Sequence, residues 1–238
     1  LKNIIPKGSV INSYLFFDGS LEFDLCKNNI FVNAHTNRFV IYEFWSCMLN
    51  DNRTLYEIAK SDQIQRLKDK EAFHILQENW AKYKDPYVRS ALFFMLNRCS
   101  EQGLISSGEF DVTRLNAVSM NYLKNFSVTN FHLSYDTNET LLSSINKNIN
   151  SDFLLLPIGK FSYNLFEHGK SLGLEQTLVN HKKLKSLLET RTKKWALIYK
   201  NHPGVYSLYS DFNIRMISEY GSVVNDRESC EDIVVTNF

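Results

Sequence analysis

The chain has 238 residues, of which 44% are hydrophobic, so it can bury a large core without the help of metals or disulfides. Its 27 basic and 26 acidic residues leave a formal net charge of +1. This balance excludes a general electrostatic attraction to nucleic acid or anionic membranes, so any such binding must come from a local patch. We expect one large domain, or one domain that carries an insertion.

The first predicted elements indicate a doubly wound α/β fold. An apolar strand is predicted over residues 13–17, and a tight turn follows at residues 18–20. A second strand is predicted over residues 30–32, and a helical apolar period begins after Asn37, which we expect to cap that helix. Strand, helix and strand in this order are typical of a sheet covered by helices on both faces.

Residues 51–114 interrupt this rhythm, and we predict a helical insertion there. The stretch "RTLYEIAKSDQIQRLKDKEAFHILQENWAKY" has a helical period among many charges, and Asp85-Pro86 marks a break. The next helix, "YVRSALFFMLNRCSEQGL", is apolar and is expected to end at Gly103. A loop or hairpin, "ISSGEFDVTRL", follows. The α/β domain then comprises residues 1–50 and 115–238.

The α/β rhythm resumes in the last part of the chain. We predict a strand over residues 128–133, a helix in "ETLLSSINKNI" and a central strand in "DFLLLPI". A helix in "EQTLVNHKKLKSLLETRT" and a strand in "KKWALIYKN" come next. The segments "FNIRMISEYG" and "EDIVVTNF" are expected to pair as an antiparallel hairpin. The fold class is therefore a three-layer, Rossmann-type α/β fold with a mostly parallel sheet, a closing antiparallel hairpin and a helical insertion.

The cysteines indicate a reducing compartment. Cys26, Cys47, Cys99 and Cys230 are far apart and have no metal-ligand spacing, so we expect reduced, buried thiols and no metal site. No apolar run approaches the roughly 18 residues of a membrane span. No signal peptide is recognised, although the chain begins at Leu1 rather than Met, which leaves open that a segment was removed. We expect a cytoplasmic or nucleoid-associated protein without a membrane partner.

Several segments together carry a family likeness. The stretch "RSALFFMLNRCSEQGLISSGEFDV" resembles the part of Dam-like adenine-specific DNA methyltransferases that reads Leu-Asn-Arg, then Asn-Gly-Leu, then Gly-x-Phe-Asn-Val. The stretch "YLFFDGSLEF" stands where that family has Glu-Pro-Phe-x-Gly-x-Gly-Ser, and "FVNAHTNRFV" stands where it has Asn-Asp-Ile-Asn. The closing "EDIVVTNF" is similar to its Glu-x-x-Ile-x-Asn strand. The resemblance covers nearly the whole chain and implies a methyltransferase-like fold, with residues 51–114 in the place of the DNA-recognition domain.

The cofactor motifs of that family are only partly present here. Phe17 and Gly19 match the first motif, but Leu15 occupies its acidic place and Leu21 its second glycine. In the second motif Asn33 is retained, whereas Ala34 replaces the aspartate that binds the ribose hydroxyls of S-adenosylmethionine. The resemblance therefore implies a vestigial cofactor site, and we expect no bound S-adenosylmethionine.

The catalytic motif has lost its acceptor. Asp-Pro-Pro-Tyr of the family falls on Leu156, Pro157, Ile158 and Gly159, at the end of the central strand. Methyl transfer to the adenine amine requires a carboxylate that draws the amine protons into place, and the tyrosine stacks on the flipped base. A site that no longer binds its ligand is expected to be refilled with apolar atoms, because an unpaired buried carboxylate costs several kcal/mol.

Two sets of polar residues have open interpretations. Asp18, Glu22 and Asp24 could form a carboxylate cluster, but we favour a solvated turn and helix start. His35 and His132 lie at predicted strand ends, where a ligand could be held, but we favour satisfied or exposed histidines.

Basic residues offer candidate DNA contacts. A helix and the turn after it contain Lys182, Lys183, Lys185, Arg191, Lys193 and Lys194. Arg114 lies near the hairpin that resembles the DNA-reading region. These side chains could contact phosphates, or they could simply form a solvated face. Asp111 replaces an asparagine of the family, and its carboxylate would repel DNA.

The sequence leaves three hypotheses. The first is a catalytically degenerate methyltransferase-like protein that acts as a binding or scaffolding subunit, partnering an active methyltransferase on DNA. The second is a divergent, active S-adenosylmethionine-dependent enzyme whose acceptor is Asp152, Asp136 or a group of a partner. The third is DNA binding alone, through the lysine-rich face of residues 182–194.

Overall fold

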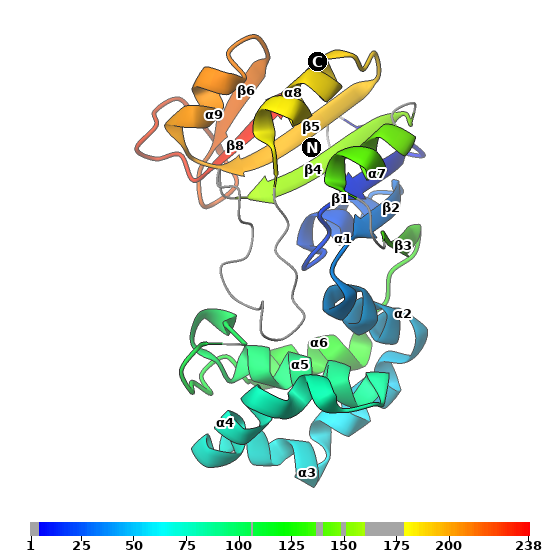
Figure 1. Cartoon of the computed structure of the whole chain (residues 1–238), viewed down its shortest axis with the longest axis vertical. Coiled ribbons are helices and arrows are strands. Elements are labelled where there is room, and N and C mark those ends of the chain that lie inside the picture. The colour runs from blue at the N-terminus through cyan, green and yellow to red at the C-terminus, as the bar shows by residue number, and fades with distance from the viewer. Residues whose placement is uncertain (1–4, 106, 137–139, 149–150, 160–178) are drawn as a thin grey trace. The chain divides into compact units, whose positions relative to one another are not determined.

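The computed structural model describes residues 5–105, 107–136, 140–148, 151–159 and 179–238 (Figure 1). These residues fall into two compact units. The sheet unit comprises the described residues among 1–37, 129–167 and 176–238, and the helical unit comprises those among 38–128. The predicted insertion, residues 51–114, lies within the helical unit.

The sheet unit contains one open sheet, to which the described residues contribute eight strands in the order β3-β2-β1-β4-β5-β8-β6-β7. The strands are β1 (Val10–Tyr14), β2 (Phe31–Thr36), β3 (Phe131–Tyr135), β4 (Phe153–Gly159), β5 (Lys194–Lys200), β6 (Asn213–Ile217), β7 (Val223–Val224) and β8 (Asp232–Thr236). Neighbours from β3 to β5 pair in parallel, whereas β8 is antiparallel to both β5 and β6. The chain is thus a mixed α/β protein with a mostly parallel sheet and antiparallel strands at one edge.

Burial along each strand follows its place in the sheet. The central strand β4 begins with four consecutive buried residues, as expected of a parallel strand covered on both faces. Strand β2 alternates between buried and less buried positions. The prediction that the first strand covers residues 13–17 is wrong in its bounds, because Leu15 has a positive φ of 62° and ends β1 at Tyr14.

Helices cover both faces of the sheet and give the unit three layers. Helix α1 (Ser20–Lys27) contacts one face, where Glu22 meets Ser13 of β1. Helices α7 (Leu141–Lys147), α8 (His181–Glu189) and α9 (Pro203–Leu208) pack on the other face. Their residues Ile145, Leu184 and Val205 join the same apolar cluster as Leu154 and Leu156 of β4.

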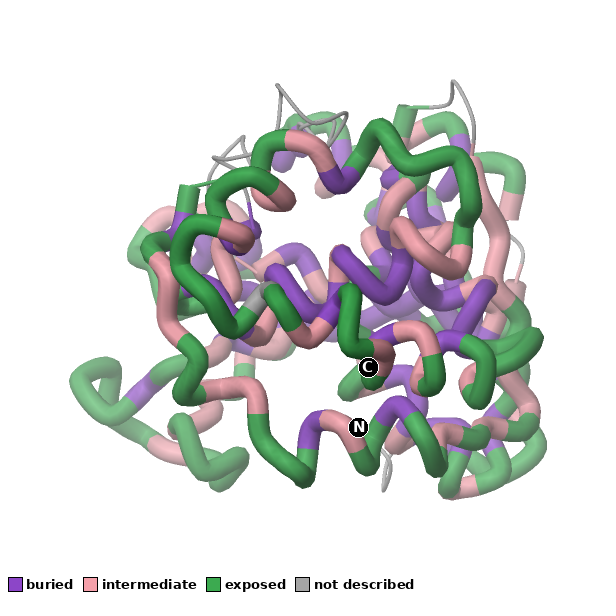
Figure 2. Tube along the Cα trace, turned by 90° about the horizontal axis from the view of Figure 1, so that it is seen from below, coloured by how far each residue is buried: buried purple, intermediate pink, exposed green. Residues whose placement is uncertain are grey.

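The helical unit has an aromatic core between its longest helices. It contains α2 (Phe39–Lys60), α3 (Asp62–Gln65), α4 (Lys70–Asn79), α5 (Pro86–Arg98) and α6 (Ala117–Asn125). Buried and exposed stretches alternate along the trace, as amphipathic helices require (Figure 2). The rings of Phe44, Trp80 and Phe93 contact one another or share a neighbour in this core. Helix α2 is interrupted at Asp51, whose carboxylate accepts bonds from Thr54.

The helix boundaries test the predicted caps. Asp85 caps α5 by accepting a 2.9 Å bond from the Val88 amide, with Pro86 in the first turn, which confirms the predicted break. Asn37 is not a cap, since Arg38 holds that position without a side-chain bond. Gly103 does not end α5 either. That helix stops at Arg98, and Gly103 belongs to a short 3-10 turn, Glu101–Gly103.

Candidate functional site

A hollow lies at the carboxyl edge of the parallel strands, where α/β folds usually bind ligands. It has a volume of about 250 Å³, including space open to solvent. Its walls come from β1, β2, the end of β3 and the start of α7: Tyr14, Leu15, His35, Asn37, Asp136, Thr140, Leu141 and Ser144. Most of this volume is open to solvent, and the enclosed part has room for roughly one water molecule, so the hollow does not hold a nucleoside-sized ligand in this conformation.

The polar groups of the hollow bond to one another. His35 Nδ1 lies 3.3 Å from Asp136 Oδ1, and His35 Nε2 lies 3.3 Å from Asn12 Oδ1. The Ser144 hydroxyl donates to the other oxygen of Asp136. The Tyr14 ring stacks on the His35 ring with centroids 4.6 Å apart. His35 is therefore a satisfied histidine, as favoured from the sequence, and His132 is exposed on β3.

Bonding also affects the acidity of Asp136. Burial raises the pKa of this carboxyl, but bonds from His35 and Ser144 outweigh burial, so the net pKa is lowered from its ordinary value. The arrangement is not a hydrolytic triad, in which an imidazole must lie between the hydroxyl and the carboxylate. Here the carboxylate lies between Ser144 and His35, so His35 cannot take the proton of Ser144.

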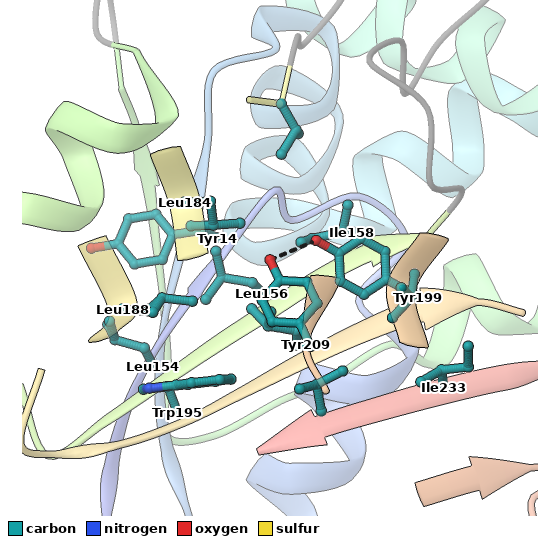
Figure 3. Close-up of a cluster of buried hydrophobic side chains, with 14 of the residues drawn as sticks. Tyr14, Leu154, Leu156, Ile158, Leu184, Leu188, Trp195, Tyr199, Tyr209 and Ile233 are labelled. Atoms are coloured by element: carbon teal, nitrogen blue, oxygen red, sulfur yellow. Dashed lines mark hydrogen bonds between the residues drawn. The ribbon is translucent and has the colours of Figure 1, made fainter. Parts of the chain in front are cut away.

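The end of β4, where the resemblance aligns a catalytic motif, contributes its side chains to the core (Figure 3). Leu156 is 0% exposed and belongs to a cluster with Tyr14, Leu154, Leu184 and Tyr199. Ile158 lies in the same cluster, whereas Pro157, between them on the strand, points to the opposite face. Gly159 ends β4 with a φ of 76°, after a shift in register against β5. The predicted break in the strand therefore lies at Gly159, on the carboxyl side of the packed residues Leu156 and Ile158.

The residues that the resemblance aligns with cofactor motifs are scattered rather than gathered around the hollow. Leu15 lines it, but Phe17 is 42% exposed, and Gly19 stands before α1 with a φ of 73°. Ala34 is completely buried within β2, and Asn33 beside it is half-buried. Of these residues only Leu15 contributes to the hollow as it is described.

Glu22 contradicts the prediction of a solvated turn and helix start. Its side chain is buried, with a residue exposure of 3%, and it accepts a 2.6 Å bond from the Ser13 hydroxyl. Burial raises the pKa of Glu22 from its ordinary value, and the nearby Asp18 adds to this effect. Asp18 itself is exposed and accepts bonds from Ser20, so the three carboxylates do not form a cluster.

The predicted DNA-contacting lysines do not form one surface. Lys182 and Lys183 are exposed in the first turn of α8, while Lys193 and Lys194 lie beyond its last turn, at the start of β5. A nine-residue helix separates the two pairs by about 13 Å. Lys185 is paired with Asp211 and Glu189, and Lys193 lies 3.4 Å from Asp152. The positive charges of Lys185 and Lys193 are therefore already paired with carboxylates of this chain.

Arg191 is not a surface residue. It is 6% exposed, and its Nη2 donates to the carbonyls of Ser151 and Lys194. Burial lowers the pKa of its guanidinium. Arg191 therefore joins the turn after α8 to the segment before β4, where no phosphate can reach it.

The helical unit contains a pair of neighbouring arginines, Arg98 and Arg114, of which only Arg114 was a predicted DNA contact. Arg114 donates 3.3 Å to the Asn97 carbonyl, and Arg98 lies close enough for the two guanidinium groups to repel. Burial and then Arg114 lower the pKa of Arg98. Asp111, expected to repel DNA, accepts a 2.9 Å bond from the Thr113 amide and so stabilises the local turn. The sequence signal for Arg98 was its place in the Leu-Asn-Arg segment, one of the segments that carry the family resemblance.

The two candidate acceptors lie at opposite ends of the sheet. Asp136 follows β3 at the carboxyl edge and lines the hollow. Asp152 precedes β4 at the amino edge and is exposed beside Lys193. Only Asp136 could face a ligand in the hollow.

Comparison with known proteins gives no further guide, since no family model and no curated protein matches the chain. Within the part of the chain that the structure describes, no group of His, Cys, Asp and Glu could hold a metal ion. In the same residues, every helix is too short or too polar to cross a membrane.

Proposed function

We propose that the sheet unit is a Rossmann-type, methyltransferase-like fold. Doubly wound folds that bind dinucleotides have the strand order 3-2-1-4-5-6. The order β3-β2-β1-β4-β5-β8-β6 repeats it, with β8 inserted antiparallel between β5 and β6. Helices on both faces support the same interpretation.

We propose further that the chain is a catalytically degenerate relative of the Dam-like adenine-specific DNA methyltransferases. It acts as a binding or scaffolding subunit that engages DNA together with an active methyltransferase. The observation that carries this proposal is the burial of Leu156, at the position that resembles the catalytic aspartate, inside an apolar cluster. Because residue 156 is a leucine, this position has no carboxylate that could accept a proton from the adenine amine.

The cofactor side of the site supports the same proposal. Leu15 occupies the hollow in the place of the family's acidic residue. The carboxylate that lines the hollow, Asp136, already bonds to His35 and Ser144. S-adenosylmethionine would have to break these hydrogen bonds before it could form its own. The proposed function therefore includes no bound cofactor.

The direct test is isothermal titration of the purified chain with S-adenosylmethionine, beside an active Dam-like enzyme as the positive control. We expect no measurable heat of binding and no transfer of labelled methyl groups to DNA. Micromolar affinity for the donor would contradict the proposal. Purification from the native source then asks whether an active methyltransferase chain elutes with this one.

The alternative, a divergent active enzyme, has one observation in its favour. Asp136 is a carboxylate at the carboxyl edge, and it borders the hollow. This alternative predicts methyl transfer to DNA that disappears in Asp136→Asn while the variant remains folded. Absence of transfer by the wild-type chain eliminates it.

A further inference from the structure

Both ring nitrogens of His35 face acceptors. The residue lies on β2, opposite Tyr14 of β1 and Ser134 of β3. Its Nδ1 atom lies 3.3 Å from Asp136 Oδ1, and its Nε2 atom lies 3.3 Å from Asn12 Oδ1. A neutral imidazole carries one N–H donor, so it can donate to only one of these two oxygens. An imidazolium carries two N–H donors, and only this charged ring satisfies both contacts.

The Asp136 carboxylate cannot supply the missing proton. One of its oxygens faces His35, and the other accepts a bond from the Ser144 hydroxyl. Burial raises the pKa of Asp136, but the bonds from His35 and Ser144 outweigh burial and leave that pKa below its ordinary value. Asp136 is therefore ionised at neutral pH, and both of its oxygens act as acceptors. The side chains of His35 and Asp136 are only 13% and 19% exposed, so water and salt screen this contact weakly.

The other groups around His35 also fit a cation. The Tyr14 ring stacks on the His35 ring with centroids 4.6 Å apart and an interplanar angle of 13°. A cation within about 6 Å of the centre of a tyrosine ring is attracted to its face. Among the described residues, the charged or titratable groups beside this pair are Asp136 at the end of β3, Tyr14 on β1 and Lys147 on α7. Asn12 of β1 is uncharged, and α7 contains no acidic residue.

These bonds join several elements around the hollow. Asn12 belongs to β1, His35 to β2, Asp136 follows β3, and Ser144 belongs to α7. The Tyr14 hydroxyl adds a 3.2 Å bond to the Ser144 carbonyl. Helix α7 has only seven residues, and a helix of that length is not stable without tertiary contacts. Loss of one bond in this chain therefore loosens α7, which forms part of the wall of the hollow.

We infer that Asn12, His35, Asp136 and Ser144 form a pH-dependent latch: the His35 imidazolium holds β1 and α7 together through Asp136, and loss of its proton releases α7 and opens the hollow. Deprotonation gives the Nε2 proton to solvent, so the Nε2 lone pair then meets the Asn12 oxygen. Histidine is the side chain whose charge ordinarily changes between about pH 5 and pH 8. The latch needs neither DNA nor S-adenosylmethionine, so it does not rest on the proposed function.

The first experiment follows the ring protons of His35 in the full chain, by heteronuclear NMR on isotope-labelled histidine. The variant His35→Gln assigns the signals by their loss. We expect both ring nitrogens of His35 to carry a proton at about pH 6. A ring with a single proton at that pH, whose Nε2 accepts a bond from a turned Asn12 amide, would overturn the inference.

The second experiment measures amide hydrogen exchange in α7 between about pH 5 and pH 8, corrected for the intrinsic exchange rate at each pH. Loss of a hydrogen bond to a charged group is expected to lower the protection of α7 by about tenfold, in step with the deprotonation of His35. In His35→Gln, which cannot take up a proton, the protection should stay constant over this range. His132→Gln, which replaces an exposed histidine of β3, is the matched control and should keep the pH dependence of the wild type.

A further variant separates release of the latch from loss of the fold. Ser144→Ala leaves His35 and Asp136 in place but removes the hydroxyl that couples them to α7. We expect His35 still to titrate in this variant, whereas the protection of α7 no longer depends on pH. Circular dichroism and thermal melts check that each variant is folded.

Three results would overturn the latch. They are constant protection of wild-type α7 while His35 loses its proton, pH dependence that persists in His35→Gln, and pH dependence that persists in Ser144→Ala. None of these results depends on the titration with S-adenosylmethionine, so the latch and the proposed function can fail independently.

Discussion

At the scale of single residues, the buried carboxyl of Glu22 contributes to the pH dependence of stability. The pKa of Glu22 is raised in the folded state, chiefly by burial, above its value in the unfolded chain. Its contribution to the free energy of unfolding is therefore fully present below the unfolded pKa and is lost as pH rises through the folded pKa.

Glu22→Gln tests this dependence, since the amide keeps an acceptor for the Ser13 hydroxyl and carries no charge. We expect the variant to lose less stability than the wild type as pH rises from below the unfolded pKa of Glu22 through its raised folded pKa. Urea denaturation at several pH values measures the effect. Parallel curves for the two proteins would show that Glu22 is not the titrating group.

The pKa of Asp136 is shifted in the opposite direction to that of Glu22. Its pKa is lowered in the folded state by bonds from His35 and Ser144, which outweigh burial. Its contribution to stability is present above the unfolded pKa and is lost as pH falls through the folded pKa. Asp136→Asn should lower the free energy of unfolding at neutral pH by about 2 kcal/mol, because it weakens two bonds to a charged group.

The same variant should flatten the acid side of the stability curve, where Asp136 of the wild type takes up its proton. Ser143→Ala, an exposed hydroxyl on the same helix that bonds only within the first turn, is the control for α7. Equal acid sensitivity in Asp136→Asn and the wild type would contradict the assignment.

At the scale of elements, β4 shows why one substitution at Leu156 is not expected to create a catalytic carboxylate. Leu156→Asp would place a carboxylate inside the buried cluster that contains Tyr14, Leu154 and Tyr199, away from water. We expect a loss of at least about 3 kcal/mol in the free energy of unfolding and no gain of methyl transfer.

Leu156→Met keeps the volume and apolar character of the side chain, so it should cost less than about 1.5 kcal/mol. Comparing Leu156→Asp with Leu156→Met separates the effect of a buried charge from the effect of a changed side-chain volume. A stable Leu156→Asp protein that transferred methyl groups would show that the corner is open, and it would remove the basis of the proposed function.

The junction between α8 and β5 depends on Arg191. Arg191→Ala removes the donor for the carbonyls of Ser151 and Lys194 together with the buried stem, and it should cost about 2 kcal/mol. Arg191→Met keeps the stem and should cost less. Neither should change the affinity for DNA, which distinguishes Arg191 from a phosphate contact. Thermal melts and anisotropy measure the two effects.

At the scale of the whole molecule, the net charge of +1 limits binding to DNA to its local patches. Lys182 and Lys183 are exposed in the first turn of α8 and test the lysine-rich face of residues 182–194. If this face contacts phosphates, replacement of both lysines by alanine should reduce the steepness of log affinity against log salt concentration by about two. An unchanged slope, measured by fluorescence anisotropy with a DNA duplex, would exclude these two lysines as phosphate contacts.

The sequence by itself determined the coarse class of the fold, a mixed α/β chain with a helical stretch in its first half, but not the bounds of that stretch, since the helical unit comprises residues 38–128 where 51–114 was expected. Apolar residues that recur every two or every 3.6 positions, and helix caps such as Asp85-Pro86, reflect local backbone geometry and can be recognised in the sequence alone. The apolar corner at Leu156 was predicted as filled, and that residue lies in the core. The order of the motifs supplied Arg114 as a candidate contact.

Only the tertiary structure decided which polar residues meet. His35 and Asp136, which are 101 positions apart in sequence, come together because parallel strands bring their carboxyl ends to one edge, and α7 then places Ser144 beside Asp136. Burial likewise turned Glu22 and Arg191 from surface charges into interior groups, since the solvent exposure of a charge depends on what packs over it. Contacts between distant segments and exclusion of water are properties of the folded chain, so a linear pattern does not contain them.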